Sequence, residues 1–171
     1  MNQENLSCFV QLFTLNDAEA TQRVSERLAL ALRDPAAYQE QFAEELAERG
    51  IVTALPAQEL RDLALIDALL TEELVWESDW KDRAADLVYG INETLTQQRR
   101  AIQLNESCQG RAQVTGPEAL DVVQDMAEPA GLAVVLFTLD SDSYALSIVA
   151  DAQVEEARKL AKELGFGVTI Y

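Results

Sequence analysis

One carboxylate of the sequence lies inside an otherwise apolar segment. Asp67 stands within residues 56–70, which are apolar around most of a helical circumference. A carboxylate in such surroundings is costly unless a cation or a hydrogen-bond donor satisfies it, and we expect Lys81 or Arg83 to be that partner. Two roles are open for Asp67: a general base with a perturbed pKa, or half of a buried pair that fixes one packing arrangement. We favour the pair.

A second group of oxygen ligands follows in residues 140–143, where two aspartates alternate with two serines. Such oxygens suit a hard divalent cation, but the segment lacks the glycine and the closing glutamate of a calcium loop, and both residue types are common turn formers. A metal-dependent enzyme would need several carboxylates to converge in one cleft. We keep this enzyme as an alternative function, with Asp67, Asp79, Asp140 and Asp142 as its carboxylates.

The sequence contains no histidine. This excludes Ser-His-Asp and Cys-His nucleophilic chemistry, as well as zinc sites that need imidazole. Glycine-rich phosphate loops and the GxSxG and HExxH motifs are also absent. The two cysteines, Cys8 and Cys108, are too far apart for a redox motif and too few for a disulfide framework. We therefore expect neither enzyme activity nor a cofactor.

The composition indicates a globular acidic protein. The 171 residues are 49% hydrophobic and 25% charged, and 30 acidic against 13 basic side chains give a net charge of −17. A chain of this length can bury a substantial core. Its negative charge repels phosphate groups, so we expect no binding to nucleic acid or membranes. The start lacks a basic leader and no apolar run is long enough to span a membrane, so we predict a cytoplasmic protein.

Acidic residues are concentrated between Asp34 and Asp86, where 14 acids stand against 4 bases and give a net charge of −10. One interpretation is a solvated helix surface that promotes solubility. The other is a surface that attracts a basic protein, because complementary fields raise association rates and carboxylates can fill a cationic active site. The residues expected to contact such a partner are Glu44, Glu45, Glu48, Glu72, Glu73, Glu77 and Asp79, with Trp76 as an apolar anchor.

Hydrophobic spacing predicts that helices position most of these residues. Apolar stripes and capping residues indicate helices over residues 6–15, 16–32, 34–50, 56–70 and 81–98. Asn16 and Asp34 are expected as N-caps, and Gly50 as the left-handed residue that ends a helix. These elements form a helical part that resembles a bundle, over residues 1–98.

The segment between the last two of these helices is irregular. Residues 74–76 are a candidate strand, and Asp79 is expected to cap the helix that follows. Trp76 and Trp80 are four residues apart, so they can share one helical face in the core, or one of them can anchor a partner. Both interpretations stay open.

The last third of the chain changes character after a connection over residues 99–116. We expect a helix over 117–126, a hairpin of strands 132–139 and 144–150, a helix capped by Asp151, and a terminal strand over 166–171. A right-handed crossover would lay the terminal strand parallel to strand 144–150, in a small mixed sheet. The sequence thus predicts one α+β domain, 1–171, whose helical part precedes an α-β-β-α-β part over 117–171.

Five short motifs carry a resemblance to a known family. They are LAERGI (46–51), ALIDAL (64–69), DWKD (79–82), LDSDSY (139–144) and LAKELG (160–165). With them, residues 34–171 resemble a family of small acidic bacterial proteins catalogued as a domain of unknown function. The resemblance implies the order of elements given above and assigns no catalytic residue, cofactor or ligand.

Proteins of this size and acidity are similar to the immunity proteins of bacterial toxin systems. This is an analogy between general types of protein. We expect a non-enzymatic protein-binding protein, an immunity protein that neutralises a basic toxin or effector domain acting inside the cell. Besides the metal-dependent enzyme, the alternative is a constitutive regulatory or scaffold module. The protein would be a monomer, or a homodimer formed through the strand at 166–171.

Overall fold

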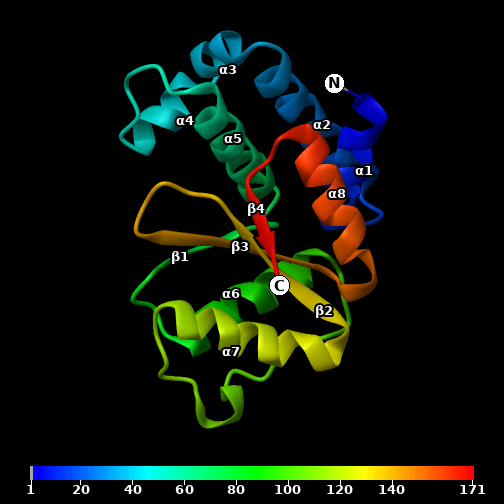
Figure 1. Cartoon of the computed structure of the whole chain (residues 1–171), viewed down its shortest axis with the longest axis vertical. Coiled ribbons are helices and arrows are strands. Elements are labelled where there is room, and N and C mark those ends of the chain that lie inside the picture. Colours follow the sequence, from blue (N-terminus) through cyan, green and yellow to red (C-terminus); the bar gives the residue numbers. More distant parts are fainter. Residues whose placement is uncertain (1) are drawn as a thin grey trace.

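A four-stranded antiparallel sheet separates two layers of helices in the computed structural model, which describes residues 2–171 (Figure 1). The strands are β1 (Trp76–Asp79), β2 (Leu132–Phe137), β3 (Ser143–Ala150) and β4 (Val168–Ile170), in the order β1-β3-β2-β4. One layer holds α1 (Gln3–Thr14), α2 (Ala18–Arg33), α3 (Pro35–Gln41), α4 (Ala43–Glu48), α5 (Ala57–Thr71) and α8 (Val154–Leu164), and the other holds α6 (Ala84–Gln97) and α7 (Pro117–Ala127). The predicted α+β class is confirmed.

Each face of the sheet belongs to a separate hydrophobic core. Successive side chains of a strand point to opposite faces, so Val135 and Phe137 of β2 join the core under α1, α2, α5 and α8, whereas Val134 joins the core under α6 and α7. Both faces are therefore buried, which explains why strands β2 and β3 are apolar along almost their whole length. Burial of each large apolar side chain contributes about 1.5–3 kcal/mol.

Several helix ends lie where the capping residues in the sequence predicted them. Asp34 caps α3 by accepting a hydrogen bond from the Ala37 amide at 3.0 Å, and Gly50 follows α4 in the left-handed region with a φ of 82°, both as predicted. The N-cap of α2 is Asp17 instead of Asn16, because the Asp17 carboxylate accepts from the Ala20 amide at 2.9 Å. The helix predicted over 34–50 is divided at Phe42 into α3 and α4.

The region around β1 differs from the prediction. The strand begins at Trp76 because residues 74 and 75 are buried in the core and pairing with β3 starts at Trp76 and Leu146. Helix α6 begins only at Ala84, so Asp79 does not cap it; the Asp79 carboxylate instead accepts from the Lys81 amide at 2.8 Å in a turn. Trp76 and Trp80 therefore lie on a strand and in a turn, and share no helical face.

The C-terminal strand joins the sheet at a different place from the one predicted. β4 runs in the same direction as β3, as the crossover implies, but it pairs with β2 in antiparallel register, Val135 opposite Ile170. Both edges of β3 are already occupied, by β1 and by β2, so β4 adds to the free edge of β2 and the sheet is not mixed. The Asp151 prediction is also wrong: Asp151 lies in a 3-10 turn, and Gln153 is the N-cap of α8.

The predicted connection over residues 99–116 joins two helices of the same layer. α6 and α7 pack on each other against one face of the sheet, and Cys108 of the connection is buried in their core (Figure 1). The sheet combines strands from both predicted parts of the chain. β1 comes from the helical part, residues 1–98, and the other three strands come from the part over 117–171.

Gly90 of α6 provides the space that Trp76 occupies. A Cβ atom at Gly90 would lie 2.1 Å from Cγ of Trp76, which is far inside van der Waals contact. The indole ring also makes an edge contact with Tyr89, with the ring centroids 5.6 Å apart. A glycine in a helix interior costs stability, so its presence here follows from the packing of β1 onto α6.

We expect Gly90→Ala to destabilise the protein by about 1–3 kcal/mol through overpacking. Helix propensity alone predicts the opposite sign, a gain of about 1 kcal/mol. Urea unfolding followed by circular dichroism measures the change. In a Trp76→Ala background the same substitution should be neutral or stabilising, and an equal loss in both backgrounds would contradict the assignment of this contact.

Candidate functional site

Helix α4, the end of α5 and strand β1 border an open, acid-lined hollow of about 460 Å³. We call it the acidic hollow, and its lining residues are Glu45, Glu48, Arg49, Asp67, Leu70, Thr71 and Glu77. Four of these residues carry carboxylates, and one, Arg49, is a base. The arrangement suits a cationic ligand group, because carboxylates in a partly desolvated site bind a cation more strongly than in open water.

The short helix α4 brings acidic side chains to the rim of the hollow. Its glutamates at positions 44 and 48 are one helical turn apart and exposed, whereas Leu46 points into the core. Gly50, with a φ of 82°, reverses the chain so that the amide of Ile51 bonds to the carbonyl of Leu46 at 2.9 Å. This turn directs Arg49 toward α5 and β1.

Arg49 holds the floor of the hollow together. Its guanidinium donates to Oδ1 of Asp67 from Nε at 2.9 Å and from Nη2 at 2.5 Å, and Nη2 also lies 2.5 Å from Oε1 of Glu77. The predicted partners of Asp67 are wrong, since Arg83 pairs with Asp86 at the start of α6. Asp67 is the buried half of an ion pair, as favoured, but its cation comes from the loop after α4.

The second carboxylate oxygen of Asp67 is left without a partner. The Asp67 side chain is only 7% exposed, and Oδ2 finds no hydrogen-bond partner among residues 2–171. Burial raises the pKa of the Asp67 carboxyl above its ordinary value, against the opposing effect of the hydrogen bonds from Arg49. Asp67 thus lines the hollow with a carboxylate whose Oδ2 atom is buried and has no partner in the described chain.

The structure divides the predicted contact residues into two sets. Three of the carboxylates are held by arginines of the same chain: Glu45 by Arg27 at 2.8 Å, Glu72 by Arg23 at 2.7 Å, and Glu77 by Arg49. The other four are exposed and form no ion pair in the chain from Asn2 to Tyr171; they are Glu44, Glu48, Glu73 and Asp79.

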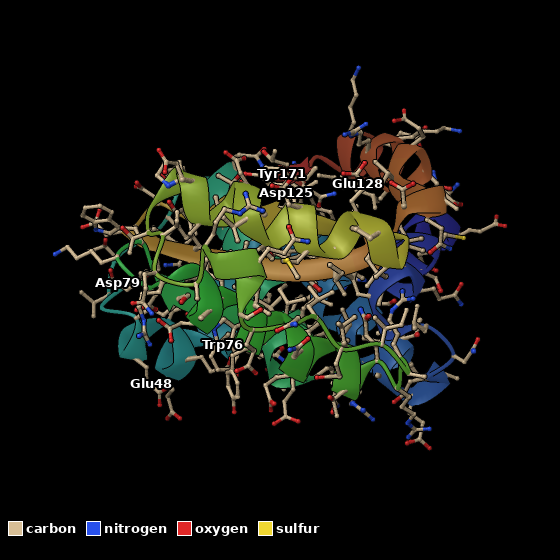
Figure 2. The ribbon with its side chains drawn as sticks, turned by 90° about the horizontal axis from the view of Figure 1, so that it is seen from below. Glu48, Trp76, Asp79, Asp125, Glu128 and Tyr171 are labelled. Atoms are coloured by element: carbon tan, nitrogen blue, oxygen red, sulfur yellow. The ribbon has the colours of Figure 1, made fainter. Side chains whose placement is uncertain are left out.

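The predicted residues gather at one end of the molecule. Figure 2 shows Glu48 and Asp79 at the left and Trp76 nearby on the lower side, away from Asp125 of α7 and from Glu128, which follows α7. Trp76 is half-buried against Gly90, so its ring serves both the interior and the surface. Sequence reasoning missed Arg49 and Arg27, since a basic residue in an acidic segment gives no local signal of the carboxylate it will meet.

The four aspartates of the metal hypothesis do not converge. Asp67 lines the acidic hollow, whereas Asp140 lines a different hollow of about 290 Å³ beside Asp62. Within residues 2–171, no three Cys, Asp or Glu side chains lie close enough to hold one metal ion. The alternative metal-dependent enzyme needs Asp67, Asp79, Asp140 and Asp142 to converge, and the described residues do not provide this convergence.

Comparison with known families identifies the chain by its sequence. The sequence model of the family described as "Domain of unknown function (DUF6630)" matches residues 5–171. The chain belongs to this family. The match includes the N-terminal helices, which the resemblance over 34–171 left out. No curated protein and no solved structure matches it, and no helix within residues 2–171 is both long and apolar enough to cross a membrane.

The raised pKa of Asp67 has a consequence for stability. The folded protein keeps the proton of Asp67 at pH values where the unfolded chain has released it, so this contribution to stability is lost as the pH rises through the raised pKa. Asp67→Asn removes the titration. We expect the stability of the variant relative to wild type, measured by urea unfolding, to increase as the pH rises above the ordinary pKa of an aspartate. A relative stability that falls with pH would contradict the raised pKa.

Removal of the Arg49 guanidinium should cost more folding stability than removal of the Asp67 charge. Arg49→Met leaves Asp67 and Glu77 without their common partner, and we expect a loss of about 3 kcal/mol in urea unfolding near neutral pH. The double variant Arg49→Met with Asp67→Asn should recover part of this loss, because only Glu77, which is more exposed than Asp67, is then left without its cation. Arg33→Met, at an exposed position, is the matched control and should change stability by less than about 0.5 kcal/mol.

Proposed function

We propose that this chain is a non-enzymatic protein-binding protein whose acidic hollow receives a cationic side chain of a basic partner protein. The observation that carries the proposal is the hollow itself, in which four carboxylates surround one arginine and Oδ2 of Asp67 lacks a partner. A lysine or arginine side chain supplies several hydrogen-bond donors and one positive charge, which is what these oxygens need.

The charge balance of the hollow favours an added cation. Arg49 is shared between two carboxylates, and Glu45 is paired with Arg27, so one positive charge from outside would still leave the lining residues net negative. Glu48 is exposed at the rim and has no cation of its own within the described residues. It is the first group that an incoming cation would meet.

The remaining acidic residues support long-range electrostatic attraction of a basic partner. The excess of 14 acids over 4 bases between residues 34 and 86 creates a negative field that reaches beyond individual contacts. Such a field raises the rate at which a basic protein arrives, and salt screens it over about 8–10 Å. The hollow would then decide which arriving surface is retained.

A basic toxin or effector domain is the partner class that we propose more specifically. A protein that acts on phosphate-bearing substrates has a cationic active site, and an acidic protein can block it by presenting carboxylates to the same groups. In this immunity role, one equivalent of the protein should abolish the activity of its toxin. A regulatory or scaffold role would instead leave the activity of a bound partner intact.

Charge reversal at the hollow tests the proposal. The substitutions are Glu48→Lys at the rim of the hollow, together with Glu44→Lys on the same helix and Glu73→Lys in the turn after α5, all at exposed positions. With a fluorescent nonalysine peptide as the probe, we expect the association rate in stopped-flow measurements at low salt to fall about tenfold. The dependence of the rate on salt should become shallower, because fewer charges attract the peptide.

A second triple variant with the same net charge is the control. It carries Glu106→Lys, Asp121→Lys and Glu128→Lys, which are exposed on the side of α6 and α7. We expect this variant to slow association by no more than about twofold. An equal loss in both variants would mean that net charge alone attracts the peptide, and the hollow would have no special part.

A further inference from the structure

A second hollow adjoins the acidic hollow. It has a volume of about 270 Å³ and lies between the end of α5, the start of β1 and α6. We call it the tryptophan hollow, and its lining residues are Leu70, Glu73, Val75, Trp76, Glu93, Thr94, Thr96 and Gln97. Leu70, which is 37% exposed, lines both hollows and forms the wall between them.

The tryptophan hollow combines an apolar wall with carboxylates. Leu70, Val75 and Trp76 supply the apolar surface, and Glu73 and Glu93 are exposed acids among the lining residues. In the described chain, none of the lining residues is a base. The Nε1 donor of Trp76 is buried without a hydrogen-bond partner among residues 2–171. This N–H needs an acceptor and so gives no site for a cation; the cationic preference of the hollow comes from its two glutamates.

A basic side chain matches this hollow better than an apolar one does. The aliphatic stem of lysine or arginine packs on leucine and tryptophan surfaces, while its charged head stays near carboxylates. An aliphatic side chain would fill the same space but would remove water from Glu73 and Glu93 without giving them a partner. The charge of the lining residues therefore favours a second cation.

We propose that the partner carries a pair of basic side chains close together in one segment, one entering the acidic hollow and the other the tryptophan hollow, with the backbone crossing over Leu70. This inference rests on the proposed function of the acidic hollow and states which basic segments the protein would select. Two cations held on either side of one leucine require a particular spacing, whereas a diffuse negative surface accepts any arrangement of charge. The protein thus distinguishes a paired basic motif from general basicity.

Peptides of equal composition test the spacing. One set of glycine-rich nonapeptides carries two arginines separated by one, two, three or four residues, and a reference peptide carries them at its two ends. In titration calorimetry we expect one close spacing to bind at least about tenfold more tightly than the reference, because the second contact becomes intramolecular. A third peptide with one arginine and one leucine at the best spacing tests the cationic chemistry of the second hollow.

The fluorescence of Trp76 reports whether the second hollow is occupied. Trp80→Phe removes the other tryptophan at an exposed position, so the emission of the variant comes from Trp76 alone. We expect the best peptide to shift this emission and the peptide with one arginine and one leucine to leave it unchanged. Glu93→Gln should reduce the advantage of the best peptide several-fold, whereas Glu106→Gln, which removes one exposed charge elsewhere, should not.

The outcomes separate the two proposals. If none of the peptides binds, the acidic hollow is not a cation site and the proposed function fails together with the inference. If all spacings bind equally and the Trp76 emission does not change, the acidic hollow keeps its function and the paired motif is wrong. If the peptide with one arginine and one leucine binds as tightly as the best two-arginine peptide, the second hollow takes an apolar side chain instead of a cation.

Discussion

The guanidinium of Arg49 is the contact on which the acidic end of the molecule depends. It joins three elements, because Arg49 follows α4, Asp67 belongs to α5 and Glu77 belongs to β1. Burial of such a group is expensive, and an ion pair of this kind is weak evidence for net stability. Its effect is geometric: two carboxylates that would repel each other are held at the floor of one hollow.

The packing of the sheet gives this contact its fixed position. β1 carries Glu77 toward Arg49 and Trp76 toward α6, where Gly90 leaves room for the indole ring. The strand is thereby fixed between the two hydrophobic cores, and a charged contact on its outer side cannot shift without disturbing the packing on the other. The carboxylates of the site are thus carried by helices and an edge strand, and Arg49 is held by the turn after α4, which suits recognition by shape as well as charge.

Local features of the fold were predictable from the sequence, and features set by competition between distant segments were not. Asp34 begins a helix and Gly50 ends one through bonds to their own neighbours, so residue type and spacing identified them. The place of β4 depends on β1, which already occupies the free edge of β3, and no pattern within residues 166–171 contains that information. The partner of Asp67 is similarly non-local, since Arg49 reaches it only because α4 turns at Gly50.

The same competition shows why clustered acidity in a sequence overstates the negative surface that a partner meets. Arg23, Arg27 and Arg49 each hold one of the carboxylates expected to contact a partner. Exposed acids such as Glu48 keep their field, whereas the paired ones mainly set the shape of the hollow. A partner that merely carried positive charge would gain little from replacing these internal arginines, because each replacement exchanges one cation for another. Selectivity therefore rests on the groups that the internal cations do not satisfy, and in the acidic hollow these are the rim carboxylate of Glu48 and Oδ2 of Asp67.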